Sequence, residues 1–523
     1  MKRIQLTFLI LIFSMHLSEA QIVSLDTAFG LNGKTQNRFP GWQSGILASK
    51  LQSDGKIVVC GFRTIYLTGD SDTILGRYNG DGTLDTTFGT NGFVVIDDLF
   101  IDGTSPKRHL IQPDGKIVVT GAKWADGEGL NFHTYRFNSN GTPDATFGTN
   151  GLVITDIDSS LDEATTVLLQ EDNKIIVLGT YSIIGNIRYL CAVRYNSDGT
   201  TDTAFGTNGN AMFGSLAANY SNQLTDAFLE TNGKIVMGAH HDIDGELGNF
   251  VVARFNADGT IDTGFGTNGA RITNFGNDDK LMAIQKINNQ YYAFGYSTIG
   301  GDETKMAIAR YSTSGSLDFS FGTNGKVLLH RNATSLYDFI SDAKVIGDKI
   351  VCSGYGESEN STVAFNVDAL LIRLNLDGSI DTSFNNTGYI MADFSNNQTD
   401  IFVTLEILPD GKIIAEGYAT VSNDDSFLLA KYISSGLANE DFASGVCKVY
   451  PNPFSESITI ESNNLDLTTA DIELFDINGR KLSEFILDGI TNTIPMNKNL
   501  AKGNYLLKIT NGGKTKTIKI IKQ

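Results

Sequence analysis

Apolar and polar positions alternate in short runs along most of the chain, and each run ends at a cluster of Gly, Asp, Asn or Pro. Residues 93–137 show this pattern, with FVVIDDLF, PKRHLIQP, GKIVVTGAKW and FHTYRF separated by polar turns. β-Branched and aromatic residues fill these runs, and the 3.6-residue period of an amphipathic helix is missing from them. The pattern predicts four short strands.

This four-strand unit recurs along the chain. The phrase LDTTFGTNG at 84–92 returns as PDATFGTNG, TDTAFGTNG, IDTGFGTNG and LDFSFGTNG, and phrases like DGKIVV and RYN interleave with it. The phenylalanine of the phrase falls at Phe29, Phe88, Phe147, Phe205, Phe265, Phe321 and Phe384. A phrase that returns at intervals of 56–63 residues marks a structural unit, whereas a catalytic motif is normally written once.

Seven units of four strands can stack as an open solenoid or close as a propeller. Closure is favoured because it leaves only short, protected edges and needs no capping repeat. The last unit ends in a broken copy, GLANEDF, while an intact LDTAFG stands at 25–30, before any complete unit. We therefore predict an all-β, seven-bladed β-propeller of four-stranded blades over residues 21–442, with the N-terminal copy completing the last blade.

The recurring phrase has features of a tight connection. An Asp three residues before each Phe suits a capped turn, and the final Gly allows the positive φ needed to enter the next strand. The Phe is expected to fill the space between blades, where its burial would contribute about 1.5–3 kcal/mol. We interpret the phrase as the connector from one blade to the next.

An arginine stands eight residues before the Asp of six connectors. The pairs are Arg77 and Asp85, Arg136 and Asp144, Arg194 and Asp202, Arg254 and Asp262, Arg310 and Asp318, and Arg373 and Asp381. The pairs would form either a ring of arginines for anionic ligands or ion pairs that tie the last strand of the unit to the connector. Ion pairs are favoured, because a partly buried Arg needs a partner. The last unit has Lys431 and Asn439 at these positions and is expected to lose the pair.

The turn between the third and fourth strand of the unit is acidic in six of seven copies. Its carboxylates are Asp70, Asp72, Asp126, Glu128, Asp242, Asp244, Glu246, Asp302, Glu303, Glu357, Glu359, Asp424 and Asp425. On one face of a propeller they would attract calcium or a basic partner, or simply keep exposed hairpins soluble, which we favour. His240 and His241 in the same turn suggest a metal site, but adjacent strand residues point to opposite faces, so we expect a solvated turn.

Charge and targeting signals limit the partners further. The formal net charge is −19, which argues against nucleic acid and anionic membranes. Lys2 and Arg3 precede an apolar run and a small-residue cleavage site, so residues 1–20 are predicted to be a signal peptide. No later stretch is long and apolar enough to span a bilayer, so we expect no transmembrane segment in the mature chain. Cys60, Cys191, Cys352 and Cys447 are expected to be buried free thiols.

The three interleaved phrases, L-D-x-x-F-G-x-N-G, D-G-K-I-V-V-x-G and R-Y-N-x-D-G-T, resemble those of the delta-60 repeat family. The resemblance covers about residues 22–442 and implies a bacterial β-propeller, with no established common activity. It therefore supports the fold and leaves the ligand open.

The pattern changes after a linker predicted at 443–448. Residues 449–523 alternate apolar and polar positions between turn signals such as Asn478-Gly479, which predicts a small Ig-like β-sandwich. YPNP at 450–453, FDINGRK at 475–481 and KGNY at 502–505 resemble the type A sorting domain of the type IX secretion system of Bacteroidetes. That resemblance implies transport across the outer membrane of a Gram-negative bacterium by the type IX machinery, followed by surface attachment or release.

Common catalytic signatures such as G-x-S-x-G, H-E-x-x-H and the P-loop are missing from the sequence. We therefore favour an exported binding or structural propeller over an enzyme, with a glycan or an envelope protein as partner. The alternatives are a hydrolase or lyase that acts on extracellular polymers with a metal in the propeller channel, and an adhesin. Calcium is the one cofactor that the sequence suggests. Exposed aromatic residues on one face would favour binding.

Overall fold

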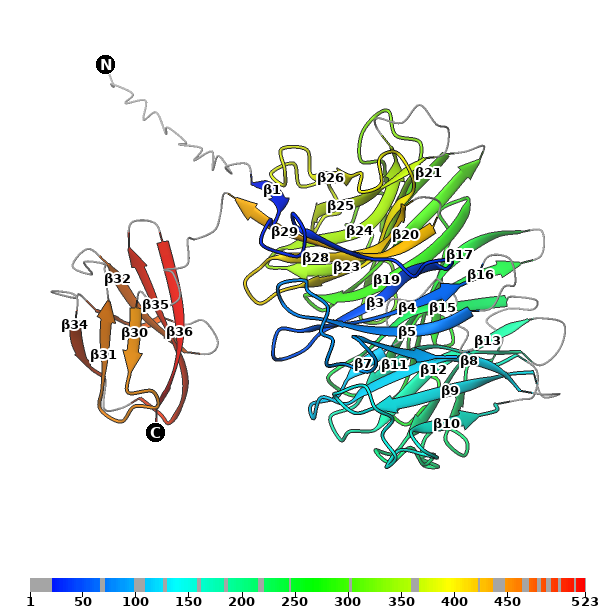
Figure 1. The fold of residues 1–523 in the computed structure, drawn as a ribbon, viewed down its shortest axis with the longest axis horizontal. Helices are drawn as coiled ribbons and strands as arrows, with labels where there is room; N and C mark the ends of the chain where they lie inside the picture. The colour runs from blue at the N-terminus through cyan, green and yellow to red at the C-terminus, as the bar shows by residue number, and fades with distance from the viewer. Residues whose placement is uncertain are drawn as a thin grey trace, which may run out of the picture. The chain divides into compact units, whose positions relative to one another are not determined.

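The strands of the protein form two compact units, one over Ile22–Ile433 and the other within Ser434–Gln523 (Figure 1). The computed structural model describes residues 21–65, 71–97, 109–125, 129–157, 161–182, 187–214, 221–243, 246–300, 303–358, 366–421, 424–435, 447–462, 470–476, 481–485, 491–496, 500–511 and 514–522. All 36 elements in these residues are strands, so the predicted all-β class is confirmed. The predicted signal peptide and residues 443–446 of the predicted linker lie outside them.

Six sheets of the first unit follow one another along the chain, each with four consecutive antiparallel strands. The first blade contains β3 (Gln43–Leu51), β4 (Ile57–Thr64), β5 (Ser71–Tyr78) and β6 (Phe93–Ile96), and the second contains β7 (His109–Ile111), β8 (Ile117–Ala125), β9 (Gly129–Phe137) and β10 (Leu152–Thr155). The third blade contains β11 (Glu163–Leu169), β12 (Ile175–Ser182), β13 (Arg188–Tyr195) and β14 (Asn210–Met212), and the fourth contains β15 (Ser221–Leu229), β16 (Ile235–Ile243), β17 (Glu246–Phe255) and β18 (Ala270–Thr273). The fifth blade contains β19 (Asp278–Ile287), β20 (Gln290–Gly300), β21 (Glu303–Ser312) and β22 (Lys326–Leu329), and the sixth contains β23 (Asp338–Ile346), β24 (Lys349–Glu357), β25 (Val367–Asn375) and β26 (Tyr389–Ala392).

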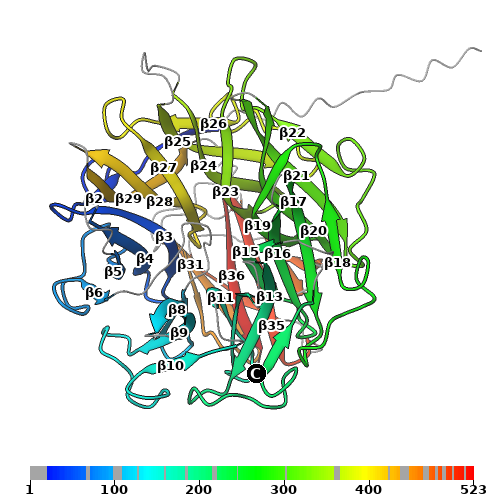
Figure 2. The same ribbon diagram turned by 90° about the vertical axis from the view of Figure 1, so that its right-hand side faces the viewer.

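The seventh sheet joins the two ends of this unit. It contains β27 (Asp400–Ile407), β28 (Ile413–Val421) and β29 (Asp424–Ser435), and β29 pairs with the N-terminal strands β1 (Ile22–Leu25) and β2 (Lys34–Asn37). Figure 2 shows the seven sheets around a common centre, with the blue β3 beside the orange β27 to β29. The first strand of each sheet lies innermost and contacts the first strands of its neighbours, and β27 contacts β3. The sheets therefore form a closed ring of seven blades, completed by the N-terminal copy.

The connector phrase joins the third and fourth strands of one blade. Residues 84–92 lie between β5 and β6, which pair with each other in the same sheet. The expectation that the phrase leads from one blade to the next is therefore wrong, because a sequence period does not show where one blade ends. Phe88 is nevertheless buried against residues of two blades, and Asn91 and Gly92 have φ of 52° and 94°, as the expected turn requires.

The glycine that ends each DGKIVV-like phrase has a steric reason. The innermost strand bulges opposite it, between Ile46 and Ala48 in the first blade. A Cβ atom on Gly61 would lie 2.2 Å from the carbonyl oxygen of Gly45, and one on Gly354 would lie 1.9 Å from that of Phe339. Only glycine leaves room for this close approach.

The apolar cores lie between neighbouring blades. The core at the closing interface combines Phe29, Ile46, Ile414 and Phe427, which come from the N-terminal copy, the first blade and the seventh blade. Cys60, Cys191 and Cys352 are buried thiols rather than disulfide-bonded cysteines, as predicted, and the side chain of Cys447 lies outside the described part. Among the described residues, no helix has the length and apolar character needed to cross a membrane.

The C-terminal unit consists of two antiparallel sheets. One contains β30 (Cys447–Tyr450), β31 (Ser457–Ser462) and β34 (Thr491–Pro495), and the other contains β33 (Lys481–Phe485), β32 (Asp471–Asp476), β35 (Gly503–Asn511) and β36 (Lys514–Lys522). Phe454, Ile458, Ile472, Leu507 and Ile520 are fully buried in one core. The arrangement agrees with the small sandwich expected from the sequence.

Candidate functional site

The six Arg–Asp pairs lie at the connectors, at one end of the propeller that we name the connector end. In the first blade, Arg77 Nε and Lys56 Nζ donate to Asp85 Oδ2 at 2.8 and 2.7 Å. The Nε–Oδ2 distance is 2.7–3.0 Å in Arg136–Asp144, Arg194–Asp202, Arg254–Asp262, Arg310–Asp318 and Arg373–Asp381. Burial would raise the pKa of Asp85, but hydrogen bonds from Lys56 and Thr87 and the charge of Arg77 hold it well below its usual range.

Each of these arginines also contacts other groups. Arg194 Nη1 donates to the carbonyl of Ala257 in the next blade at 2.9 Å, and its guanidinium lies 4.5 Å from the centre of the Phe205 ring. The six arginine side chains are only 5–13% exposed. This geometry supports ion pairs that fasten neighbouring blades and leaves the guanidinium groups little surface for an anionic ligand.

The seventh blade forms a variant of the same arrangement. Lys431 Nζ lies 3.8 Å from Asp26 Oδ2, donates to the carbonyl of Gly80 at 3.3 Å, and lies 5.4 Å from the centre of the Phe29 ring. The expectation that the last unit loses both members is therefore wrong. The N-terminal copy supplies the carboxylate and the phenylalanine, and Asn439 lies outside the described residues.

The described residues of the predicted acidic turns lie at the opposite end of the propeller, which we name the hairpin end. Asp70, Asp126, Glu128, Asp244, Asp302 and Glu359 lie outside the described residues, and the side chains of Asp242 and Glu246 are not described. The described carboxylates bind neighbouring groups: Asp72 binds Arg63, Glu303 binds Lys305 and His330, Glu357 accepts from Leu336 N, Asp424 binds Arg38, and Asp425 accepts from Thr420. The described members of this set thus interact locally rather than forming a shared ring.

His240 and His241 are buried within β16. Their exposed fractions are 4% and 1%, so the expectation of a solvated turn at these two residues is wrong. His240 Nδ1 lies 3.3 Å from the carbonyl of Leu281, and His241 Nε2 lies 3.1 Å from Asn249 Nδ2. Both side chains serve the packing of the fourth blade in this arrangement.

Aromatic side chains that sequence reasoning missed lie near the hairpin end. The position after the close-packed glycine holds Phe62, Tyr296, Tyr355 and Tyr418 in the first, fifth, sixth and seventh blades, and Ala122, Thr180 and Ala239 in the other three. The Phe339 ring lies 4.8 Å from that of Tyr296 and 4.4 Å from that of Tyr355, centre to centre. We name Phe62, Tyr296, Phe339, Tyr355 and Tyr418 the aromatic arc.

The arc continues across the closing interface, because a Cβ atom on Gly45 would lie 2.9 Å from the Phe62 ring and 3.0 Å from the Tyr418 ring. All five members are partly exposed. Burial, and then the charge of Asp425, raises the pKa of Tyr418 to about 12, so its hydroxyl stays protonated at neutral pH. The arc therefore combines apolar ring surface with neutral hydroxyl groups.

The innermost strands of the blades carry ion pairs. Lys50 Nζ lies 3.1 Å from Glu406 Oε1 and thereby links the first and seventh blades. Lys344 Nζ donates to Asp342 Oδ2 at 2.7 Å, and the Thr404 hydroxyl donates to the same oxygen at 3.1 Å. These charges neutralise one another in pairs and connect neighbouring blades.

One group of three carboxylates among the described residues has the spacing of a metal site. One oxygen each of Asp368, Asp393 and Asp400 lies within 4.8 Å of the others. Asp368 starts β25, Asp393 follows β26, and Asp400 starts β27, so the group lies between the sixth and seventh blades at the hairpin end. The sequence did not indicate this group of carboxylates, because Asp368 and Asp400 stand 32 positions apart in the chain.

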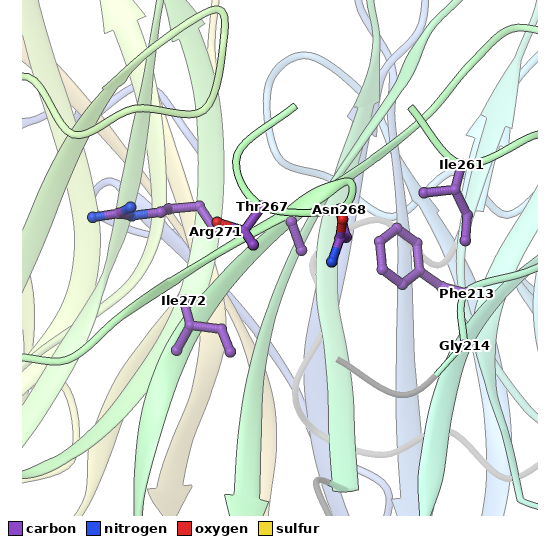
Figure 3. A pocket seen from close by; sticks show the side chains of 8 residues that line it. Phe213, Gly214, Ile261, Thr267, Asn268, Arg271 and Ile272 are labelled. Carbon is purple, nitrogen blue, oxygen red and sulfur yellow. The ribbon is translucent and has the colours of Figure 1, made fainter. Parts of the chain in front are cut away.

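A pocket on the rim of the propeller lies apart from these groups. Phe213, Ile261, Asn268 and Ile272 line it where the outer strands β14 and β18 approach each other. Figure 3 shows the Phe213 ring beside Asn268 and Ile261, while the side chain of Arg271 extends away from the ring. The pocket therefore combines apolar side chains with the amide group of Asn268.

Two family models match the sequence. Residues 448–523 match the secretion system C-terminal sorting domain, and residues 52–88, 112–147, 170–205, 230–265 and 349–384 match the domain of unknown function (DUF5122) beta-propeller. The chain thus carries a β-propeller repeat region followed by a sorting domain of the type IX secretion system found in Bacteroidetes. The sorting domain indicates export to the cell surface or the extracellular space.

Three solved structures illustrate what the chain resembles. PorZ, an essential bacterial surface component of the type IX secretion system of Porphyromonas gingivalis, is 14% identical with a TM-score of 0.40, and the match covers 91% of this chain and 59% of PorZ. A PL25 ulvan lyase is 10% identical with a TM-score of 0.44, covering 77% and 98%. The β-propeller domain of the Trilobed protease from Pyrococcus furiosus is 8% identical with a TM-score of 0.38, covering 75% and 96%. No curated protein matches the chain in sequence.

Proposed function

We propose that this protein is a binding propeller that the type IX machinery delivers to the outside of the cell, where it stays attached to the surface or is released. Its ligand contacts the hairpin end through the aromatic arc. The arc is the observation that carries this proposal, because partly exposed aromatic rings on one face are what a binding surface needs and what repeat packing alone does not require.

A glycan chain is the ligand that fits the arc best. Sugar rings present apolar C–H faces that stack on aromatic rings, and their hydroxyl groups exchange hydrogen bonds with neutral phenol groups. The arc extends over four blades, so it offers consecutive contacts to an extended polymer. An acidic protein would repel an anionic polymer, so we expect a neutral or weakly charged glycan.

Binding of the mature chain to a glycan array tests the proposal. Tyr355→Ala should weaken the binding of any captured glycan at least tenfold, since an aromatic hot spot is typically worth about 2 kcal/mol or more. Phe319→Ala is the matched control, because Phe319 is 71% exposed but belongs to a connector at the other end. Equal affinity of the two variants would exclude the arc as the binding surface.

Incubation of the mature chain with the captured glycan also distinguishes the two alternative functions, an adhesin and a polymer-degrading enzyme. An adhesin would use the arc on glycans of another cell, so whole cells that display the captured glycan should bind the mature chain but not Tyr355→Ala. A lyase or hydrolase would shorten the polymer, which chromatography of the supernatant detects. Polymer shortening would replace the binding proposal with an enzymatic one.

A further inference from the structure

We propose that Asp368, Asp393 and Asp400 bind one divalent cation, preferably calcium, between the sixth and seventh blades. This site is independent of the aromatic arc and of the ligand proposed for it. Three carboxylate oxygens within 4.8 Å of one another can all reach a single ion. Hard oxygen ligands of this kind suit calcium and magnesium rather than softer metals.

The second observation is an oxygen without a partner. Asp400 is fully buried, and its Oδ1 has no hydrogen-bond partner among the described residues. Its other oxygen, Oδ2, accepts from the backbone N–H groups of Phe394 and Ser395 at 2.6 and 3.2 Å. These bonds fix the carboxylate and leave Oδ1 without a hydrogen-bond partner from the described residues, although a buried polar atom normally has one.

The equivalent aspartates of the fifth and sixth blades differ from Asp400 in the partner of this oxygen. Asp279 and Asp338 start the inner strands of the fifth and sixth blades and are fully buried like Asp400. Asp279 Oδ1 accepts from Ser297 Oγ at 2.6 Å, and Asp338 Oδ1 accepts from the guanidinium of Arg331. In these two blades a hydroxyl or a guanidinium therefore binds the Oδ1 atom whose equivalent in the seventh blade, Asp400 Oδ1, has no such partner among the described residues.

The residues around Asp400 differ from those around Asp279 and Asp338, and two of them are carboxylates. Ala419 pairs with Asp400 where Ser297 pairs with Asp279, so β28 carries no hydroxyl at this register position. Asp368, which is 3% exposed, and the exposed Asp393 lie there as well. A buried charge needs a compensating one, and a cation is the partner that satisfies all three carboxylates together.

The three carboxylates lie close enough to repel one another when ionised, and a bound cation would remove that repulsion. Asp393 also holds its own loop, since its Oδ1 accepts from the N–H groups of Ser395 and Asn397 at 3.0 and 3.2 Å. The ion would thus join β25, the loop after β26 and the first strand of the closing blade.

Calorimetric titration of the chelator-treated mature chain with calcium chloride tests the site. We expect one calcium per chain, with a Kd of about 10⁻⁴–10⁻³ M as in other extracellular calcium modules. We also expect the melting temperature to rise with calcium. Asp393→Asn should weaken calcium binding at least tenfold and remove the rise, while its amide oxygen can still accept the loop hydrogen bonds. Asp348→Asn is the control, because that side chain is 84% exposed in the same blade, away from the cluster.

Two results would overturn the proposal. One is a wild-type chain that binds no calcium and melts at the same temperature with calcium and with a chelator. The other is Asp393→Asn that folds, by circular dichroism, and still binds calcium like the wild type. Titration with magnesium chloride decides the preference, because tighter magnesium binding would contradict the assignment to calcium. The glycan array reports on the arc separately, so failure of one proposal does not imply failure of the other.

Discussion

Lys431 contacts Asp26 across the closure of the ring, although one residue lies in the last strand of the propeller and the other follows its first strand. Their Nζ–Oδ2 distance is 3.8 Å, whereas the six arginines approach their aspartates to 2.7–3.0 Å. The closing pair is thus a looser form of the contact that recurs in the other blades.

Lys431→Arg should stabilise the propeller, because a guanidinium can bind Asp26 and the Gly80 carbonyl together, as the other blades do. Both side chains are partly shielded, at 12% and 15% exposed, so we expect a modest gain of up to about 1 kcal/mol and a higher melting temperature. Lys305→Arg, at a more exposed surface pair, is the control. A melting temperature of Lys431→Arg at or below that of the control would contradict the expectation.

Arg136→Ala should destabilise the propeller much more than Lys123→Ala. Arg136 is 4% exposed and binds Asp144, which keeps only Lys116 at 3.0 Å as a charged partner after the substitution. Loss of one member of a buried pair typically costs about 3 kcal/mol or more, whereas the exposed Lys123 bond to the carbonyl of Asp97 should matter little. Thermal and urea unfolding midpoints measure the difference.

The double variant Arg136→Ala with Asp144→Ala separates two causes of this loss. If the desolvated carboxylate dominates, the double variant should recover part of the stability. If lost packing on Phe147 dominates, it should be no more stable than Arg136→Ala. Equal midpoints for Arg136→Ala and Lys123→Ala would show that the pair does not fasten the blades.

The repeats allowed the propeller to be predicted, but not the position of each connector within it. Strand patterns and the intact N-terminal copy at 25–30 indicated blades and their closure, since both depend on local sequence. The period did not show that residues 84–92 join β5 to β6, because any starting point gives the same period. Pairing of Lys431 with Asp26 followed only from the three-dimensional arrangement.

The candidate sites were harder to predict because they depend on departures from the repeat. Tyr355 and Tyr418 occupy a position that holds Ala122 or Thr180 elsewhere, and such variation looks like ordinary divergence in a single sequence. Asp400 belongs to a recurring set of buried aspartates, but only the structure shows that Ala419 faces it and that Asp368 and Asp393 approach it. Contacts between blades carry this information, and repeat spacing does not.

Glu416→Gln should change the pH dependence of stability. Glu416 is fully buried in β28, neither of its oxygens has a hydrogen-bond partner among the described residues, and Lys344 and Asp342 also influence it. Burial, and then the charge of Glu406, raises the pKa of Glu416 well above its usual value. A raised carboxyl pKa stabilises the fold below the unfolded pKa of about 4.3, and this contribution is lost as pH rises toward the folded pKa.

The wild-type melting temperature should therefore fall from pH 5 to pH 8 more steeply than that of Glu416→Gln. The variant should escape the loss of about 1.4 kcal/mol per pH unit that the wild type undergoes between the unfolded and the folded pKa, because an amide does not titrate. Glu406→Gln is the opposite case, since it removes the negative charge that Lys50 binds and should destabilise the fold. Parallel pH profiles for the wild type and Glu416→Gln would refute the assignment of a raised pKa.

Removal of residues 446–523 should stop export without unfolding the propeller. The C-terminal unit has its own core and a sorting-domain match that starts at residue 448, while the propeller closes with β1 and β2. The truncated chain should cross the inner membrane through its predicted signal peptide and accumulate folded in the periplasm. Cell fractionation and protease protection in a host with type IX secretion measure this.

The reciprocal fusion of residues 443–523 behind an unrelated periplasmic protein should carry that protein to the surface. Surface exposure of the truncated chain, or periplasmic retention of the fusion, would show that the C-terminal unit is not the export signal.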